Sequence, residues 1–455
     1  MKKVKISFIG AGSVSFCPAT AVDVLRSELF ATVDVEMCLM DIKEKPLELS
    51  KSFCEKIAKR LNRKITLTST LNLQEAVDGA DFVITAIEVE RYHYWSQDFH
   101  IPRRYGFRQV YGENGGPGSM FHTLRNLPPL LEIARAMEKG CPNAWMLNYT
   151  NPEAKLVEGI ARLSSIKVVG LCHGEMMGAD QLSMLLQMPR EKIGYNCVGL
   201  NHFGWFTKIW DKDTKEDLYP KLREAEKKAY SLALWDDMAL SRIMFRTYGL
   251  WPYPGTNHIG EYIAWSDDFL ASAKAQYYFD PVVDKPWETR NAPPFVYSFA
   301  HGSNYDLFTE TKADEETYED AFKADGEIYG SGEYGIPIAE AIFFNKPLEV
   351  GSVNMPNRGY AKDLPEGMVI ELPAMVDGNG IHPHICDPLP TAVAQMISNQ
   401  GAIHKLVIDA YQEQSRNKLL QAVLLDPTIS SYHNAVAMIN EMCELQKDIL
   451  PLLKW

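Results

Sequence analysis

The sequence has no run of roughly 18 consecutive apolar residues, the length that a helix needs to cross a lipid bilayer. It also has no excess of basic residues, since 46 lysines and arginines stand against 59 aspartates and glutamates and give a net charge of −13. An acidic chain gains little from contact with a polyphosphate backbone. We therefore expect that the protein neither binds nucleic acid nor spans a membrane.

Paired cysteines are missing as well. The eight cysteines are scattered, and none forms a CxxC pair, which indicates reduced thiols of a cytoplasmic protein rather than a disulfide framework. The first apolar run, residues 4–9, is interrupted by Lys5 and Ser7 and leads directly into a glycine turn, which favours a buried strand over a secretion signal. We find no internal repeat and no low-complexity segment.

What the first half does contain is an alternation of short apolar runs with longer amphipathic stretches. The runs at residues 4–9, 35–40, 82–87, 145–148 and 168–172 are expected to be strands, and residues 19–29, 47–61, 123–139 and 153–163 are expected to be helices. Strands that alternate with helices are typical of βαβ units. The pattern predicts an α/β fold with an N-terminal, doubly wound parallel sheet of the Rossmann type.

The pattern changes after about residue 195. Residues 225–244 and 391–455 are expected to be helical, whereas residues 347–376 contain short β-like runs. We therefore expect a Rossmann domain at residues 1–195 and an α+β domain at residues 196–455, as in lactate and malate dehydrogenases. The second domain would carry substrate, metal and the oligomer interface.

The turn after the first strand favours a dinucleotide. Gly10-Ala11-Gly12-Ser13 lets the backbone approach a pyrophosphate at the start of the first helix, although the usual third glycine is replaced by Ser15. Asp41 ends the second strand, where a carboxylate binds the adenosine ribose and repels the extra phosphate of NADP. We predict NAD as cofactor, with Gly10, Gly12, Ser13 and Asp41 as contacts. The alternative is a structural turn beside a solvated carboxylate.

Two later segments favour a cation. Cys172 follows an apolar strand, and His202 lies thirty residues further on. A thiolate and an imidazole together suit a first-row divalent metal with open positions for substrate oxygens. Spacing alone leaves open that both are core residues. The amides of Asn148 and Asn151, after the strand at 145–148, could hold sugar hydroxyls or the nicotinamide ribose, or could cap a turn.

Taken in order, these motifs resemble glycoside hydrolase family 4, whose members depend on NAD instead of the usual pair of carboxylates. The matching segments are Gly10-Ala11-Gly12-Ser13, Met40-Asp41-Ile42, Gly116-Pro117-Gly118, Leu124-Arg125, Asn148-Tyr149-Thr150-Asn151-Pro152, Cys172-His173, Asn201-His202, Glu261-Tyr262 and Val376-Asp377-Gly378-Asn379-Gly380-Ile381. They extend over most of the chain.

The resemblance implies a small-molecule glycoside as substrate and an unusual route to its hydrolysis. NAD oxidises the C3 hydroxyl, the acidified C2 proton is removed, the glycosidic oxygen leaves, water adds and the hydride returns. A divalent cation, usually Mn²⁺, stabilises the negative charge that develops on the C2 and C3 oxygens. It also implies that the protein is a homodimer or homotetramer.

The resemblance assigns roles by position. Cys172 and His202 would bind the metal, and Asn151 would contact substrate. Tyr262 matches the proposed C2 base, Glu113 matches an acidic site residue, and His173 would protonate the leaving oxygen or orient the sugar. Alternative readings are a packed aromatic for Tyr262 and a turn carboxylate for Glu113.

The residue after Cys172 separates branches of the family. His173 is typical of branches that act on non-phosphorylated α-glycosides, and the pattern is most similar to the α-galactosidase branch. The chain departs from that branch at Gly174-Glu175, at Ser119 and at residues 253–258. A uronide, as in α-glucuronidases or α-galacturonidases, is therefore an alternative substrate. Arginines 91, 103, 104 and 108 are cationic candidates for it, although a solvated charged loop also explains them.

Two other classes of protein fit some of these motifs. A plain NAD-dependent 2-hydroxy-acid dehydrogenase would use the same dinucleotide turn without a metal. A non-catalytic NAD-binding sensor would need neither Cys172 nor Tyr262, so their presence favours an enzyme.

Overall fold

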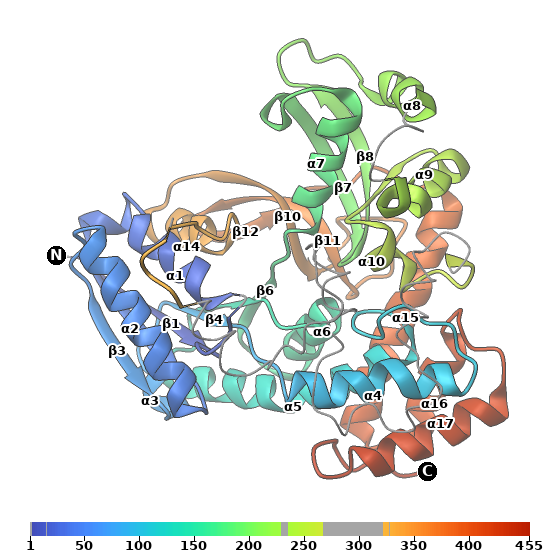
Figure 1. The fold of residues 1–455 in the computed structure, drawn as a ribbon, viewed down its shortest axis with the longest axis horizontal. Coiled ribbons are helices and arrows are strands. Elements are labelled where there is room, and N and C mark those ends of the chain that lie inside the picture. Colours follow the sequence, from blue (N-terminus) through green and yellow to red (C-terminus); the bar gives the residue numbers. More distant parts are fainter. Residues whose placement is uncertain (1, 15, 229–234, 267–321, 327) are drawn as a thin grey trace.

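The computed structural model describes residues 2–14, 16–228, 235–266, 322–326 and 328–455. The strands within these ranges form one twelve-stranded sheet in the order β3-β2-β1-β4-β5-β6-β10-β11-β7-β8-β9, with β12 paired to β11 (Figure 1). The sheet therefore runs without interruption from the N-terminal half of the chain into the C-terminal half.

The first half of the sheet is parallel. Its strands are β1 (Lys3–Ile9), β2 (Asp34–Met40), β3 (Thr66–Thr70), β4 (Phe82–Thr85), β5 (Trp145–Asn148) and β6 (Lys167–Gly170). The five predicted strands are present, although β4 and β6 each end two residues early. Only β3 was missed, because it is a largely polar edge strand without the apolar run of a buried one.

Seven α-helices lie in the described part of the chain before β7. They are α1 (Cys17–Arg26), α2 (Glu44–Arg60), α3 (Leu73–Val77), α4 (Arg91–Arg104), α5 (Gly116–Gly140), α6 (Glu153–Leu163) and α7 (Gly174–Leu186), with a 3-10 turn, η1, at Phe30–Thr32. α6 has the predicted bounds. α5 starts earlier than residue 123, because Pro117 lies in its first turn, where a missing N–H breaks no hydrogen bond.

The alternative of a solvated loop for the arginine-rich segment was wrong for residues 91–104, although Arg108, beyond this stretch, is exposed and lies in a loop. Residues 91–104 form the helix α4, even though Pro102 lies inside it. Trp95 and Phe99 are buried, so the segment packs through its aromatic side chains despite its charge. α4 lies along α5 in Figure 1.

The second half of the sheet is antiparallel. Its strands are β7 (Ile193–Leu200), β8 (Phe203–Asp211), β9 (Trp251–Tyr253), β10 (Leu348–Pro356), β11 (Val369–Asp377) and β12 (Gly380–Pro383). β10 joins β6 where Asn354 pairs with Gly170. The predicted domain boundary between residues 195 and 196 falls inside β7, and it remains a prediction.

The helices of the second half are α8 (Tyr219–Lys228), α9 (Trp235–Tyr248), α10 (Thr256–Gly260), α14 (Gly335–Phe344), α15 (Thr391–Glu413), α16 (Arg416–Leu425) and α17 (Tyr432–Leu445), with a 3-10 turn, η2, at Arg190–Lys192. The helix predicted at 225–244 corresponds to parts of α8 and α9, and residues 229–234 lie outside the described ranges. The predicted C-terminal helices are present.

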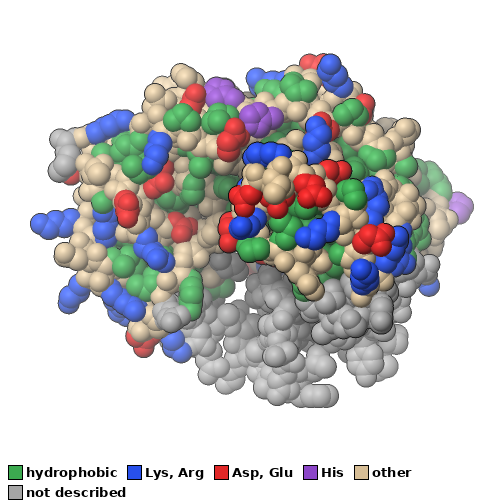
Figure 2. All heavy atoms as spheres, turned by 90° about the horizontal axis from the view of Figure 1, so that it is seen from above, with side chains coloured by type: hydrophobic (Ala, Val, Ile, Leu, Met, Phe, Trp, Pro, Cys, Tyr) green, Lys and Arg blue, Asp and Glu red, His purple; other side chains and the backbone are tan. Residues whose placement is uncertain are grey.

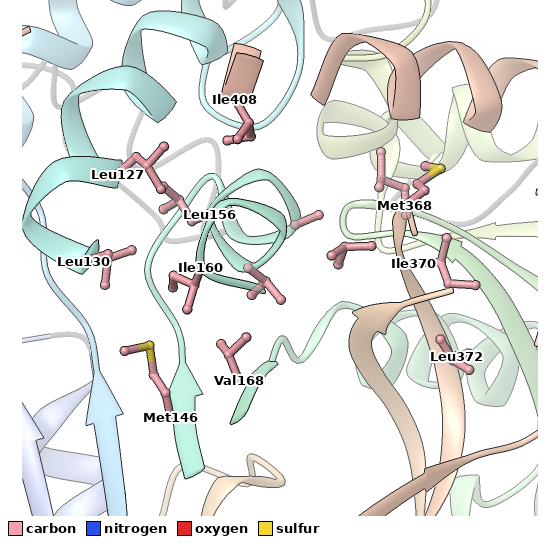
Figure 3. Close-up of a cluster of buried hydrophobic side chains, with 14 of the residues drawn as sticks. Leu127, Leu130, Met146, Leu156, Ile160, Val168, Met368, Ile370, Leu372 and Ile408 are labelled. Carbon is pink, nitrogen blue, oxygen red and sulfur yellow. The ribbon is translucent and has the colours of Figure 1, made fainter. Parts of the chain in front are cut away.

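α6 is the central helix of the core. Figure 3 shows Leu156 and Ile160 of α6 between side chains of α5, α15 and the sheet. Leu127, Met146, Val168, Ile370 and Ile408 are among the buried neighbours. Full burial of one such side chain is worth about 1.5–3 kcal/mol. This packing fixes the N-terminal end of α6, which lies next to Asn151, the predicted substrate contact.

The described surface carries charges of both signs. On the face shown in Figure 2, lysines and arginines are mixed with aspartates and glutamates rather than gathered into one basic region. Among the helices that the structure describes, none combines the length and the apolar character needed to cross a membrane.

Candidate active site

The turn between β1 and α1 packs closely against its neighbours. Gly10 has a φ of +85°, and a Cβ there would lie 2.2 Å from the carbonyl oxygen of Ala86. A Cβ on Gly12 would lie 2.6 Å from Pro46 Cβ and 2.9 Å from Asp41 Oδ2. Both positions therefore require glycine.

Asp41 is held beside this turn. Its Oδ2 accepts a hydrogen bond from the Gly12 N–H at 2.8 Å, and its Oδ1 accepts one from the Lys43 N–H at 2.9 Å. The Ser13 N–H donates to the Gly10 carbonyl at 2.9 Å. The structure thus brings together the four residues predicted from the dinucleotide motif, at the carboxyl ends of β1 and β2.

Asn148 is fully buried and engaged within the protein. Its Oδ1 accepts from Thr85 Oγ1 at 2.9 Å, and its Nδ2 donates to the Thr150 carbonyl at 3.1 Å. This is the geometry of a capped turn. The carbonyl of Asn151 accepts from Asn126 Nδ2 at 2.9 Å, so the main chain after β5 is tied to α5. Contacts of Asn148 with cofactor and of Asn151 with substrate remain predictions.

Cys172 lies just beyond the end of β6 and is half-buried. Its Sγ accepts from the Gly174 N–H at 3.4 Å. Burial raises the pKa of the thiol well above its usual value, the charges of Glu371 and Glu333 add to this, and Asn201 acts in the opposite direction. A bound cation would favour the thiolate.

His202 occupies the tight turn between β7 and β8. Its φ of +63° is unusual for a residue with a side chain, and the residue is buried. Burial lowers the pKa of the imidazole well below its usual value, and His258 and His173 contribute in the same direction. Within the described ranges its Nδ1 has no hydrogen-bond partner. A neutral imidazole with a nitrogen available is the form that binds metals.

His258 of α10 was not among the predicted site residues. Its ring meets that of His202 edge to face, with centroids 4.4 Å apart and planes at 86°. In the part of the chain that the structure describes, no group of three or more His, Cys, Asp or Glu side chains is arranged to hold a metal ion. The protein ligands predicted from sequence are only two, so substrate or solvent would complete the coordination.

Tyr262 is buried directly beside the His202 turn. Its hydroxyl donates to the carbonyl of Asn201 at 3.0 Å, and its ring stacks on Phe203 with centroids 5.1 Å apart. Burial raises the pKa of the tyrosine well above its usual value, and the charge of Glu261 adds to the effect. A role as base therefore requires a nearby cation.

Glu113 lies in the loop that leads into α5. Its Oε1 binds the Arg91 guanidinium at 2.7 Å, and Arg91 also reaches Glu88 at 3.3 Å. Burial pushes the pKa of Glu113 upward, but Arg91 and His122 outweigh it, so the pKa is lowered. Glu88, which contacts His122 at 2.9 Å, has a pKa of about 2, because His122 and Arg91 overcome its burial.

Two of the other candidate arginines have partners away from the Arg91–Glu113 ion pair. Arg103 donates to the Gln109 carbonyl, and Arg104 lies 3.7 Å from Glu441 on α17. Arg108 follows α4 in the chain. Among the cationic candidates, Arg91 contacts Glu113, a predicted site residue.

His173 is the first residue before α7, and its side chain is 52% exposed. Its Nδ1 contacts Glu333 Oε1 at 2.8 Å. This hydrogen bond raises the pKa of the imidazole more than burial lowers it. Glu333 was not predicted, because it lies far away in the sequence and carries no motif.

Comparison with known proteins extends over the whole chain. The model of the family 4 glycosyl hydrolases matches residues 5–188, and that of their C-terminal domain matches residues 197–429. The chain is 28% identical to an α-glucosidase of Erwinia rhapontici, with 99% of each chain covered. It is 29% identical to an α-galactosidase of Bacillus subtilis, with 99% of this chain and all of the relative covered.

Solved structures show the same fold. A 6-phospho-α-glucosidase from gut microorganisms, crystallised with NAD and Mn²⁺, superposes with a TM-score of 0.77 at 24% identity, and both chains are fully covered. Malate dehydrogenase of Plasmodium falciparum superposes with a TM-score of 0.51 at 12% identity, covering 92% of this chain and 99% of that one. The predicted dehydrogenase-like fold is confirmed. The two family models together span most of the sequence, and the chain belongs to family 4 of the glycosyl hydrolases.

Proposed function

We propose that this enzyme is an NAD- and divalent-metal-dependent α-glycosidase that acts on a small, non-phosphorylated, α-galactoside-like substrate. The observation that carries the proposal is the meeting of three segments at one site. Tyr262 donates a hydrogen bond to the turn that presents His202. A hydrogen bond from the Asn201 side chain of the same turn lowers the pKa of the Cys172 thiol, against the effect of burial. A plain 2-hydroxy-acid dehydrogenase has no use for this arrangement.

The residues present fit both groups. The glycines of the β1–α1 turn leave room for a close approach of pyrophosphate, and Asp41 faces that turn. Cys172 and His202 supply sulfur and nitrogen donors suited to Mn²⁺ or a similar ion. When bound, NAD would accept and return the C3 hydride, and the cation would stabilise negative charge on the C2 and C3 oxygens. Solved relatives of the fold contain NAD and Mn²⁺.

The side chains then have distinct tasks. Tyr262 would remove the C2 proton, since its hydroxyl is buried next to the proposed ligands. His173 has its Nδ1 engaged by Glu333, so its other nitrogen is the one available to donate a proton to the leaving oxygen. Glu113 and Arg91 would hold sugar hydroxyls through charged hydrogen bonds.

The charge around the site favours a neutral sugar. Arg91 is already shared between Glu88 and Glu113, so a substrate carboxylate or phosphate would have to compete with two protein carboxylates. Relatives include α-galacturonidases, such as one from Thermoanaerobacter italicus that is 27% identical with 98% of this chain covered. A uronide is therefore the alternative substrate, and the assay panel described next distinguishes it from a neutral sugar.

The test is a panel of nitrophenyl α-galactoside, α-glucoside, α-galacturonide and α-glucuronide with the corresponding 6-phosphates, assayed with NAD and Mn²⁺ under reducing conditions. We expect release of nitrophenol from the neutral α-glycosides, no accumulation of NADH, and loss of activity with a chelator. Cys172→Ser should abolish turnover but keep NAD affinity. Cys386→Ser, a half-buried thiol away from the site, is the control.

The outcomes separate the alternatives. Stoichiometric NADH without cleavage would identify a dehydrogenase, and preference for the uronides would overturn the neutral-sugar assignment. Full activity of Cys172→Ser would remove the thiol from the mechanism. We further propose that the enzyme is cytoplasmic, which its free cysteines in the described structure support. We also propose a homodimer or homotetramer, and light scattering tests this oligomeric state.

A further inference from the structure

One buried carboxylate joins two parts of the site that are far apart in the sequence. Glu261 directly follows α10 and is 0% exposed. Its Oε1 accepts hydrogen bonds from the main-chain N–H groups of Glu113 at 2.8 Å and of Asn114 at 3.1 Å. Its neighbour in the chain is Tyr262. The loop that carries Glu113 is therefore attached to the residue next to Tyr262.

Gly115 in this loop lies in close contact with Glu261. A Cβ on Gly115 would lie 2.6 Å from the Glu261 carbonyl oxygen and 2.7 Å from its Cβ. Only glycine at this position allows the contact.

The opposite side of the loop is held by α6. The ammonium group of Lys155 donates to the Asn114 carbonyl, and the Glu153 N–H donates to Asn114 Oδ1 at 3.3 Å. α6 is itself fixed by the central core. The loop thus lies between a rigid helix and Glu261, and His122 Nδ1 also contacts the Glu113 carbonyl at 3.0 Å.

We propose that Glu261 is a positioning residue: its carboxylate fixes the Glu113 loop relative to Tyr262, so that both side chains meet the same sugar ring. The expected effect on catalysis rests on the proposed glycosidase function. The claim that Glu261 holds the Glu113 loop does not depend on that function. Both main-chain N–H groups reach the same oxygen, Oε1, so the carbonyl oxygen of an amide could accept the same two bonds and Glu261→Gln should retain part of the positioning that Glu261→Ala loses.

The first test measures amide hydrogen exchange in full-length protein, with and without substitution. Glu261→Ala should raise the exchange of the Glu113 and Asn114 amides, read from a peptide that spans the loop. Glu226→Ala removes another buried carboxylate, which binds Arg242 and Arg246 far from the loop, and should leave that peptide unchanged. Unchanged exchange in Glu261→Ala overturns the proposal.

The second test measures kinetics on the best substrate of the panel. Glu261→Ala should lower kcat by about 100-fold, the effect of misplacing a reacting group by about 1 Å, with KM and NAD affinity nearly unchanged. Glu261→Gln should lie between wild type and Glu261→Ala. In a Glu113→Ala background the further loss from Glu261→Ala should shrink, because the loop then has less to position.

Other results have definite meanings. A loss that follows only the fraction of folded protein, or one that adds fully to that of Glu113→Ala, overturns the positioning role. If wild-type enzyme cleaves no glycoside in the panel, the proposed function fails, while the exchange experiment still decides whether Glu261 holds the loop.

Discussion

At the scale of single residues, the site contains buried polar atoms that the protein itself does not satisfy. Within the described ranges, Nδ1 of His202, Nδ2 of Asn114 and Oε2 of Glu333 are buried and lack hydrogen-bond partners. Such groups are rare in folded proteins because an unmet donor or acceptor is destabilising by roughly 1–3 kcal/mol. Such atoms also occur elsewhere in the described structure, but those beside Cys172 and the Glu113 loop lie where a ligand could satisfy them.

Tyr262 gives the clearest residue-scale prediction. Tyr262→Phe removes the proposed base, so kcat should fall by about 10²–10⁴-fold, whereas NAD affinity should not change. The lost hydrogen bond to the Asn201 carbonyl should lower the free energy of unfolding by about 1 kcal/mol. Steady-state kinetics and urea unfolding measure the two effects.

Tyr219→Phe is the matched control for that variant. Tyr219 is also buried and also donates its hydroxyl to a main-chain carbonyl, that of Phe206, but in α8. Because its hydroxyl also accepts a hydrogen bond from the Trp251 N–H at 3.3 Å, Tyr219→Phe should lose at least as much stability as Tyr262→Phe but keep wild-type kcat. Equal kinetics for the two variants would exclude Tyr262 as the base.

Single residues were predictable where a local motif carries them. Asp41 follows a strand at a fixed distance from the glycine turn, and Cys172 with His202 matched a family pattern. Glu261 was noted only as part of that pattern, and Glu333 and His258 were not assigned at all. Their importance depends on contacts between distant segments, such as Glu333 with His173, and one sequence contains no signal for such pairs.

At the scale of elements, the apolar runs predicted buried strands, and polar or charged elements were missed. β3 is a threonine-rich edge strand, and α4 combines charged residues with an internal Pro102. Both owe their structure to tertiary packing, which overrides local propensity. The glycine turn after β1 was predictable, because its chemistry is local.

The tight packing of that turn leads to a prediction for Gly12. Gly12→Ala places a methyl group against Pro46 and the Asp41 carboxylate, so the turn must move away from β2. We expect NAD affinity to fall about 10-fold or more, equivalent to about 1.4 kcal/mol, with little change in secondary structure. Titration calorimetry with NAD measures the loss.

Gly326→Ala serves as the control, because no atom of the described residues would lie within 4 Å of the added Cβ. It should bind NAD like the wild type. Wild-type affinity in Gly12→Ala would mean that the β1–α1 turn does not hold the cofactor.

At the scale of the whole molecule, the two halves are joined by one row of residues across the sheet. Gly170 of β6 pairs with Asn354 of β10, Asn354 with Glu371 of β11, and Glu371 with Gly199 of β7. The carboxylate of Glu153 occupies the space above Gly170, where a Cβ would lie 1.1 Å from its Oε1. The sequence could not predict this continuity, since the antiparallel pairing of β6 with β10 joins Gly170 to Asn354, which are 184 residues apart (354 − 170).

That row makes stability depend on pH. Burial, with a contribution from Glu175, raises the pKa of Glu371 from 4.5 to about 8. Between these values the folded state keeps a proton that the unfolded state has released, so the contribution of Glu371 to stability falls as pH rises from 4.5 to 8. Above about 8 the carboxylate is ionised in both states and its destabilising contribution is constant.

Glu371→Gln removes this titration while keeping the size of the side chain. Relative to wild type, its free energy of unfolding should therefore rise between pH 5 and pH 8, by more than the roughly 1.4 kcal/mol that corresponds to one pKa unit. Urea unfolding at pH 5, 6.5 and 8 measures the difference. A constant difference between Glu371→Gln and wild type across this range would mean that Glu371 is already ionised in the folded protein and that its burial does not raise its pKa.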